Sequence, residues 1–301
     1  MNSEVSLARR TSFKIGGTAK SFHEPESPEE LGRVLVHFHR LGEKPFILGG
    51  GANTLFPDGE FSRPVVSTAR LRFIGVEGNV IRAECGVRLN TLIRTAIRAG
   101  LGGLEGFVGI PGTVGGAVIM NAGGGGWSFG EHVREVGLIP TSGGPAFRVK
   151  GSDIEWSYRN ANLKDLVVAW VGLELVPSRP ARLRSLSREY MIKKAETQPL
   201  GHASAGCIFR NPVKNPDGGS AGQLIERLGM KGLARGGASV SECHANFIVN
   251  TAGRARARDV VCLIEEVRAR VEASFGVRLE TEIVVAKEEA ISDQHSALRE
   301  S

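Results

Sequence analysis

Residues 106–130 form an uncharged stretch that contains ten glycines. The stretch is long enough to cross a bilayer, but its glycines and Pro111 give a poor helix, and lipid does not tolerate unpaired backbone. It is therefore predicted to be a glycine-rich loop inside a folded protein. The whole chain has 40 glycines among 301 residues, about twice the usual share of roughly 7%. We infer that some of its backbone approaches another group closely.

A second glycine-rich segment, residues 48–53, directly follows the short apolar strand predicted at residues 46–48. The N–H groups of Gly49, Gly50 and Gly51 can form a concave site for a pyrophosphate. A simple tight turn is the alternative, because G-x-G-x-x-G and a Walker lysine are both absent. Residues 109–117 offer a second backbone-lined surface, with Thr113 and Asn121 as polar contacts. Two such segments favour a dinucleotide over a mononucleotide.

The length and charge of the chain limit the functions it can have. Three hundred and one residues allow about two domains with ample core. Lys plus Arg number 38 and Asp plus Glu number 32, a net charge of +6. The basic residues are dispersed, and the densest run, Arg254, Arg256 and Arg258, opens a predicted helix without interleaved aromatics. This pattern indicates solvated surface, so we expect no nucleic-acid partner.

The four cysteines never form a C-x-x-C pair, which argues against a zinc ribbon or a thioredoxin motif and fits a reducing compartment. His37 and His39 diverge on their predicted helix, so no metal site is expected. Arg9, Arg10 and Lys14 interrupt the N-terminal stretch before an apolar run of signal length can form. We expect a cytoplasmic protein with no membrane partner.

Periodicity predicts helices and strands in both halves of the chain. Ser27-Pro28-Glu29-Glu30 reads as a capping box that begins a helix over about 28–41. Val260, Ile264, Val267, Val271 and Phe275 form one apolar helical stripe that ends at Gly276. The other predicted elements are a β-hairpin over 72–83 that turns at 77–79, a helix over 89–100, a linker at 177–180, a basic helix over 181–195, a short helix near 224–228, and strands over 247–249 and 279–285.

Six short motifs follow one another along the chain. They are TSFKIGG at 11–17, LGGGAN at 48–53, GIPGTVGGA at 109–117, YR at 158–159, AGCIFRNP at 205–212 and HANFIVN at 244–250. Over residues 11–285 the chain resembles the UDP-N-acetylenolpyruvoylglucosamine reductase (MurB) family, in which these motifs occur in the same order. The only tyrosines are Tyr158 and Tyr190, so the chain is more similar to the shorter subclass, which lacks a substrate-covering loop.

The resemblance implies an α+β protein. Its FAD-binding fold, of the vanillyl-alcohol-oxidase (PCMH) type, would comprise one subdomain at residues 1–68 and another at 69–180. A C-terminal α/β substrate-binding domain would follow at 181–287, then a polar tail at 288–301.

The implied activity is the NADPH-dependent reduction of an enolpyruvyl ether to a lactyl ether through FAD. The product would be UDP-N-acetylmuramate for peptidoglycan, and the UDP-sugar and NADPH would share one cleft. No histidine lies in the glycine segments, so we expect non-covalent FAD. The cofactor-binding residues carried over from the family motifs are Leu48, Gly49, Gly50, Gly51, Ala52, Asn53, Ile110, Pro111, Gly112, Thr113, Gly115, Gly116 and Ala117.

The resemblance also implies three catalytic residues: Arg159, Cys207 and Glu282. Arg159 would meet the charge that develops on the substrate carboxylate. Cys207 stands where the family most often has the serine that protonates the intermediate, and an ordinary thiol with a pKa near 8.5 is mostly protonated at pH 7. Glu282 matches the family's glutamate, but Glu280 lies on the same strand face, and Thr281 departs from the family's proline. The implied substrate-binding residues are Tyr158, Asn211 and Lys231.

Two alternatives stay open. Another FAD oxidoreductase of the same fold, such as an aldonolactone or alcohol oxidase, would have a similar cofactor site. Residues 205–212 and Glu282 argue against it. A non-enzymatic nucleotide-binding protein is the other alternative, and flavin absorbance of the purified protein would exclude it.

Overall fold

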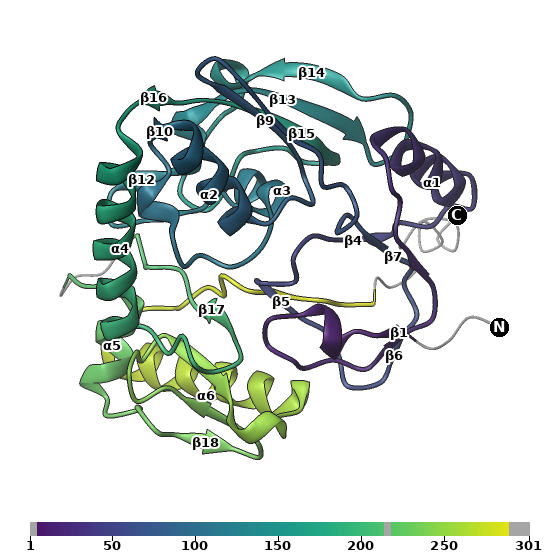
Figure 1. Ribbon diagram of the computed structural model, residues 1–301. Helices are drawn as coiled ribbons and strands as arrows, with labels where there is room; N and C mark the ends of the chain where they lie inside the picture. The colour runs from purple at the N-terminus through teal and green to yellow at the C-terminus, as the bar shows by residue number, and fades with distance from the viewer. Residues whose placement is uncertain (1–4, 214–217, 289–301) are drawn as a thin grey trace.

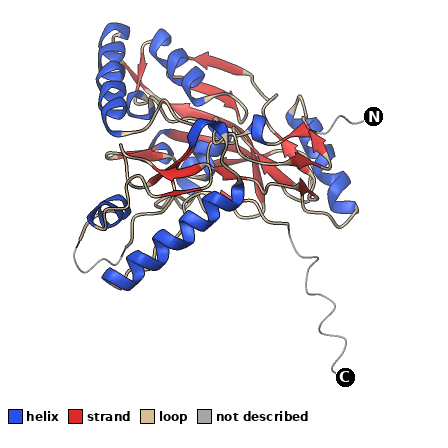
Figure 2. Ribbon diagram, turned by 90° about the horizontal axis from the view of Figure 1, so that it is seen from below, coloured by secondary structure: helices blue, strands red, loops and turns tan. Residues whose placement is uncertain are grey.

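The computed structural model describes residues 5–213 and 218–288. Apart from Glu288, the predicted polar tail lies outside these residues. In Figure 1, a large sheet with helices beneath it forms one part of the molecule, and α4 (Pro180–Thr197) runs along one side to a second part that contains α5 and α6. Figure 2 shows that the strands lie mainly in the centre, with helices around them.

The large sheet is antiparallel throughout and has the order β14-β13-β15-β9-β8. Its strands are β8 (Ile74–Glu77), β9 (Val80–Glu84), β13 (Val133–Pro140), β14 (Phe147–Lys150) and β15 (Leu166–Glu174). Glu77 pairs with Val80 across a tight turn, so the predicted hairpin is confirmed. Helix α2 (Leu89–Ala99) and helix α3 (Val114–Ile119) contribute apolar side chains to the same core as the sheet.

Among the described residues, the N-terminal part contains two small sheets and one α-helix. Strands β3 (Phe22–His23), β7 (Val65–Ser67) and β4 (Phe46–Leu48) run parallel, whereas β1 (Val5–Ser6), β2 (Thr18–Ala19) and β6 (Glu60–Phe61) form the other sheet. The helix predicted from residue 28 is confirmed as α1 (Pro28–Arg40). Ser27 Oγ accepts a hydrogen bond of 3.2 Å from the Glu30 N–H, while the Glu30 carboxylate accepts 2.7 Å from the Glu26 N–H, one residue earlier than in a standard capping box.

The C-terminal part is a four-stranded antiparallel sheet with two helices. The strand order is β17 (Ser204–Cys207), β20 (Phe247–Asn250), β19 (Ala238–Val240) and β18 (Ala234–Arg235). Helix α5 spans Ala221–Arg227, and α6 spans Ala257–Phe275. The stripe predicted on α6 is buried except for Phe275, which is half-buried against the same core, and the helix ends at Gly276 with φ +64°, so this prediction is confirmed.

The predicted linker at 177–180 is wrong. Val176 and Pro177 form β16, which pairs with β10 (Leu101–Gly102), and the Ser178 N–H donates to the Gly100 carbonyl at 2.7 Å. Helix α4 begins directly afterwards. The Pro-Ser-Arg-Pro sequence therefore makes a rigid corner against α2, because its backbone groups find partners in the preceding domain.

The strand predicted over 279–285 is also wrong in extent. Only Val284–Val285 form a strand, β21, which pairs in parallel with β5 (Thr54–Leu55). Before it, Thr281 makes a single bridge with Phe209, and the Glu282 N–H donates to the Ile208 carbonyl at 2.7 Å. The yellow segment in Figure 1 thus crosses the middle of the molecule and changes partners on the way.

The N-terminal residues contribute to more than one core. Phe13, Ile15 and Leu55 are buried in the same cluster as the apolar face of α6. The Asp58 carboxylate accepts from the Ala257 N–H at 2.6 Å and so caps α6. The domain boundaries at 68, 180 and 287 stay predictions. No helix within the described ranges has the length and apolar character needed to cross a membrane.

Candidate active site

The two glycine segments meet backbone against backbone. A Cβ atom on Gly50 would lie 2.7 Å from the Gly112 Cα, and one on Gly51 would lie 2.1 Å from the Arg10 carbonyl oxygen. Real Cβ atoms do not approach other atoms so closely. A Cβ atom on Gly49 would meet only the Thr113 hydroxyl oxygen, at 3.0 Å. The contact between the segments therefore requires glycine at 50, close packing against Arg10 requires glycine at 51, and the surface beside Gly49 faces Thr113.

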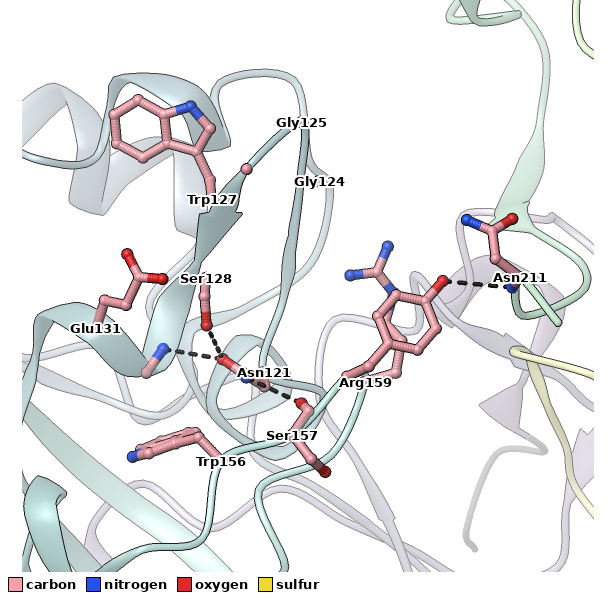
Figure 3. A pocket seen from close by; sticks show the side chains of 13 residues that line it. Asn121, Gly124, Gly125, Trp127, Ser128, Glu131, Trp156, Ser157, Arg159 and Asn211 are labelled. Atoms are coloured by element: carbon pink, nitrogen blue, oxygen red, sulfur yellow. Dashed lines mark hydrogen bonds between the residues drawn. The ribbon is translucent and has the colours of Figure 1, made fainter. Parts of the chain in front are cut away.

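Thr113 and Asn121, the two polar residues expected to contact a ligand, differ in their hydrogen bonds. Thr113 Oγ1 is buried and has no hydrogen-bond partner among the described residues. Asn121 is instead fully engaged: its Nδ2 donates to the Ser157 carbonyl at 3.0 Å, and its Oδ1 accepts from Ser128 Oγ at 3.0 Å and from the Gly130 N–H at 2.9 Å (Figure 3). The expected ligand role of Asn121 is therefore corrected to a structural one. The unpartnered Thr113 hydroxyl remains available for a bound group.

Gly115 also has a structural reason to lack a side chain. It is buried in α3, and a Cβ atom there would lie 2.7 Å from the Cys85 Cβ atom. A side chain at 115 would therefore collide with the protein itself, whether or not a ligand is bound. Gly116 is exposed, and a Cβ atom there would meet only Thr113 Oγ1, at 3.9 Å.

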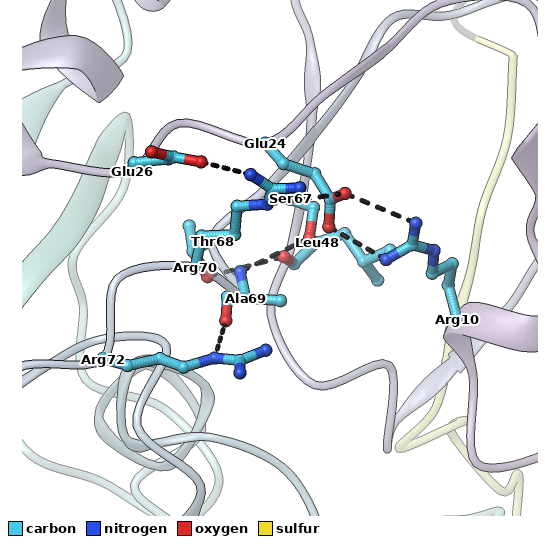
Figure 4. A network of polar contacts seen from close by, with 9 residues as sticks. All are labelled: Arg10, Glu24, Glu26, Leu48, Ser67, Thr68, Ala69, Arg70 and Arg72. Carbon is cyan, nitrogen blue, oxygen red and sulfur yellow. Dashed lines mark hydrogen bonds and ion pairs between the residues drawn. The ribbon is translucent and has the colours of Figure 1, made fainter.

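Polar contacts surround the point where β4 leads into the first glycine segment (Figure 4). The Thr68 N–H donates to the Leu48 carbonyl at 2.9 Å. Arg10 Nη1 donates to Glu24 Oε1 at 2.9 Å, and Arg70 forms an ion pair with the same carboxylate. The chain thus enters residues 49–51 from a fixed position.

Arg159 lies in a tight turn and points toward Glu282. Reciprocal backbone hydrogen bonds between Ser157 and Asn160 close the turn, and Arg159 has φ +57°, an uncommon value for a residue with a side chain. Its Nε donates to Glu282 Oε1 at 2.7 Å, and its Nη1 donates to the Gly123 carbonyl at 2.8 Å. Within the described residues its Nη2 has no acceptor. Two contacts therefore fix the guanidinium and leave one nitrogen to donate.

Glu282 and Glu280 occupy different environments. The Glu282 side chain is 13% exposed and pairs with Arg159, whereas Glu280 is exposed and makes no such pair. Asn53 Nδ2 donates to the Glu282 carbonyl at 3.1 Å, so the first glycine segment ends against the Glu282 backbone. The two carboxylates, equivalent in the sequence pattern, are separated because residues 279–283 are not a regular strand.

Burial dominates the electrostatics of this cluster. It raises the pKa of Glu282, against the opposing effects of the Arg159 and Arg210 charges. Burial also raises the pKa of Cys207 to about 12; the Glu282 charge raises it further, and Arg159 opposes the shift. The thiol is therefore protonated at neutral pH, but it is a weaker acid than an ordinary thiol. Cys207 ends β17, next to Ile208, whose carbonyl binds the Glu282 N–H.

A pocket of about 670 Å³ lies beside this cluster (Figure 3). Its walls include Trp127, Trp156 and Arg159, from the hairpin of β11 (Gly123–Gly124) with β12 (Trp127–Ser128) and from the loop that follows β14. Tyr158 Oη accepts from the Asn211 N–H at 3.4 Å, so two of the predicted substrate residues meet here. Lys231 does not line this pocket and pairs with Glu226.

Arg210 and Lys194 also lie near these segments, and no role was predicted for either from the sequence. Arg210 lies inside the AGCIFRNP motif, and this motif is the sequence signal that could have pointed to it. Lys194 Nζ donates to the carbonyls of Gly106, at 3.2 Å, and Val108, at 2.6 Å, and burial lowers its pKa to about 8. The basic composition of α4 indicated no such contact, because it did not reveal which helix face packs on the glycine-rich stretch.

Comparisons with known proteins match this arrangement over nearly the whole chain. A family model for an FAD-binding domain matches residues 19–144, and one for the C-terminal domain of UDP-N-acetylenolpyruvoylglucosamine reductase matches residues 198–286. A curated reductase of that name from Moorella thermoacetica is 41% identical over 280 residues, which cover 93% of this chain and 91% of the relative. The chain belongs to the UDP-N-acetylenolpyruvoylglucosamine reductase family.

Two further members support the assignment. The reductase from Synechococcus sp. (strain RCC307) is 39% identical over 290 residues, covering 94% of this chain and 93% of the relative. The crystal structure of the Thermus caldophilus member superposes with a TM-score of 0.78 at 32% identity, covering 94% of this chain and 98% of that one. The predicted family, the α+β fold class with an FAD-binding domain, and FAD as cofactor are confirmed.

Proposed function

We propose that this protein is a flavin-dependent reductase that transfers a hydride from NADPH, through non-covalent FAD, to the enolpyruvyl ether of UDP-N-acetylglucosamine-enolpyruvate. The product is UDP-N-acetylmuramate, a precursor of peptidoglycan. The observation that carries the proposal is the Arg159–Glu282 ion pair beside a buried thiol, held against a glycine-lined cofactor site.

The residues of the cofactor site fit FAD. Gly49, Gly50 and Gly51 present backbone where a side chain would collide, and Thr113 offers a buried hydroxyl with no protein partner among the described residues. We assign the pyrophosphate to this site, because backbone N–H groups and a free hydroxyl suit its oxygens. When bound, FAD supplies reversible two-electron hydride transfer.

Arg159 binds the carboxylate of the enolpyruvyl group. Its Nη2 is free to donate, while Glu282 and the Gly123 carbonyl fix the rest of the guanidinium. Reduction of the double bond moves negative charge into that carboxylate, and a preorganised cation stabilises the charge as it develops. The arginine is therefore placed to favour the transition state over the bound substrate.

Cys207 donates the proton that completes the reduction. Its pKa of about 12 keeps the proton on Sγ until the substrate becomes basic. Glu282 has two effects: it orients Arg159 through the 2.7 Å contact, and its charge helps to keep the thiol protonated. We assign Cys207 the role that the family more often gives to serine.

The pocket beside Arg159 accommodates the rest of the substrate. Tyr158 and Asn211 lie at its edge and are proposed to contact the sugar nucleotide, and NADPH would enter the same cleft. Lys231, paired with Glu226 and outside this pocket, stays a candidate for the distal end of the nucleotide. We also propose that the protein works in the cytoplasm and has no nucleic-acid or membrane partner. The alternative oxidase is disfavoured, because the family match includes the reductase C-terminal domain.

Stopped-flow spectroscopy tests this function. NADPH should bleach the flavin absorbance of the purified protein under anaerobic conditions, and UDP-N-acetylglucosamine-enolpyruvate should then restore it with formation of UDP-N-acetylmuramate. A reduced flavin that this substrate does not reoxidise would contradict the proposal.

A further inference from the structure

A second pocket, of about 570 Å³, shares no lining residue with the pocket beside Arg159. Its charged lining residues are Arg210, Arg268, Arg278 and Glu280. Three guanidinium groups and one carboxylate give this pocket a formal charge of +2. A pocket with this excess of positive charge attracts anions.

Only one of the three arginines is neutralised by the protein. Arg268 Nε donates to the Leu279 carbonyl at 3.0 Å, and its Nη1 donates to both Glu265 carboxylate oxygens at 2.6 and 2.7 Å. Within the described residues, the side chains of Arg210 and Arg278 form no hydrogen bond and no ion pair. Although Glu280 lines the same pocket, its carboxylate pairs with neither of them. The pocket therefore contains two guanidinium groups with unused donors.

Arg210 gives the clearest indication of a ligand. Its Nε is buried and has no acceptor in the described part of the chain. A buried donor of a charged group is costly unless it is satisfied. The Arg210 N–H bond to the Glu280 carbonyl, at 2.9 Å, fixes the backbone from which this side chain enters the pocket.

We propose that this pocket binds a phosphoryl group, which Arg210 and Arg278 contact while Arg268 forms a fixed wall. A phosphoryl oxyanion supplies negative charge to the two guanidinium groups that no protein carboxylate neutralises, and its several oxygens can accept from both at once. The group belongs either to free inorganic phosphate or to a nucleoside diphosphate.

Occupancy of this pocket would act on the active site through Arg210. The Arg210 charge lowers the pKa of Glu282, on the neighbouring segment. An anion bound to Arg210 offsets that charge, so the pKa of Glu282 rises when the pocket is filled. By linkage, protonation of Glu282 then favours anion binding to the same degree.

Titration calorimetry at constant ionic strength tests the site, with inorganic phosphate in one arm and UDP in the other. Arg278→Gln removes an exposed arginine of the pocket, and Arg254→Gln is the matched control, an exposed arginine of the same part of the molecule outside the pocket. The wild type and Arg254→Gln should bind at least one of the two ligands saturably, and Arg278→Gln should weaken that binding about 10-fold.

The ligand that shows this pattern identifies the source of the phosphoryl group. Absence of saturable binding of both ligands to the wild type would overturn the proposal. Equal weakening in Arg278→Gln and Arg254→Gln would also overturn it, because it would reflect net charge alone. The measurement needs no turnover, so its result does not depend on the proposed function.

Discussion

The cofactor site and the reacting cluster are built in opposite ways. The cofactor site is made of backbone: residues 49–50 and 112–113 are close because glycine lets two segments of the chain touch. The reacting cluster is made of side chains from distant positions, Arg159, Cys207 and Glu282, joined by an ion pair and by single backbone hydrogen bonds. Changes in the first region should therefore remove the cofactor, while changes in the second should slow one chemical step with the cofactor still bound.

The largest expected effect follows from a change in the cofactor site. Gly50→Val should purify without flavin, because its Cβ atom would lie 2.7 Å from the Gly112 Cα and push the two segments apart. Gly201→Val is the control, since a Cβ atom there meets nothing within 4 Å. The measurement is the ratio of flavin to protein absorbance. A folded Gly50→Val protein with stoichiometric FAD would show that this contact does not shape the cofactor site.

Substitution of Glu282 and of Glu280 distinguishes a residue of the reacting cluster from one outside it. Glu282→Gln should lower kcat for substrate reduction by roughly 10²–10⁴, because Arg159 loses its charged partner. Glu280→Gln should stay within a few-fold of the wild type. Both variants should purify yellow. If Glu280→Gln has the larger effect, the catalytic carboxylate is wrongly assigned.

Thiol alkylation tests the environment of Cys207. Only the thiolate reacts, and a pKa of about 12 leaves far less thiolate at pH 8 than an ordinary pKa near 8.5 does. Cys207 should therefore react about 10²–10³-fold more slowly than exposed Cys243 and Cys262. Because its raised pKa lies above the tested range, its rate should keep rising about tenfold per pH unit from about pH 9 to 11.

Peptide mapping by mass spectrometry would follow each cysteine separately. Rapid labelling of Cys207 at pH 8 would contradict the buried, protonated thiol described above.

The smallest expected effect distinguishes the two polar residues of the second glycine segment. Thr113→Val should raise the dissociation constant of FAD about 10-fold with little change in stability, because its hydroxyl has no partner in the described protein. Asn121→Ala should lower the free energy of unfolding by about 2–3 kcal/mol, because it removes three hydrogen bonds, and leave FAD affinity nearly unchanged. Flavin fluorescence titration and thermal melting check the pair; exchanged phenotypes would reverse the assignment.

The sequence predicted local features well. The Ser27–Pro28 start of α1, the apolar stripe of α6 and the 77–80 hairpin depend on neighbouring residues, and all three are confirmed. The family resemblance named Arg159 and Glu282, which the structure pairs; the site residues and their roles stay predictions.

Contacts between distant residues were not predictable. Periodicity could not separate Glu282 from Glu280, because the irregular course of residues 279–283 depends on backbone bonds to Ile208 and Asn53. Nor could it show that Asn121 is satisfied by Ser128, Gly130 and Ser157, or that residues 177–178 pair with residues 100–101. In each case the deciding partner lies elsewhere in the chain, and no local pattern encodes it.

The most direct test of the account is the effect of Cys207→Ala on the two half-reactions measured separately. Flavin reduction by NADPH should stay within a few-fold of the wild type, whereas turnover of the enolpyruvyl substrate should fall by roughly 10²–10⁴, the contribution of a positioned general acid. Cys207→Ser should recover much of this loss. Near-normal turnover in Cys207→Ala would contradict the account, because another group would then supply the proton and the buried thiol would serve only in packing.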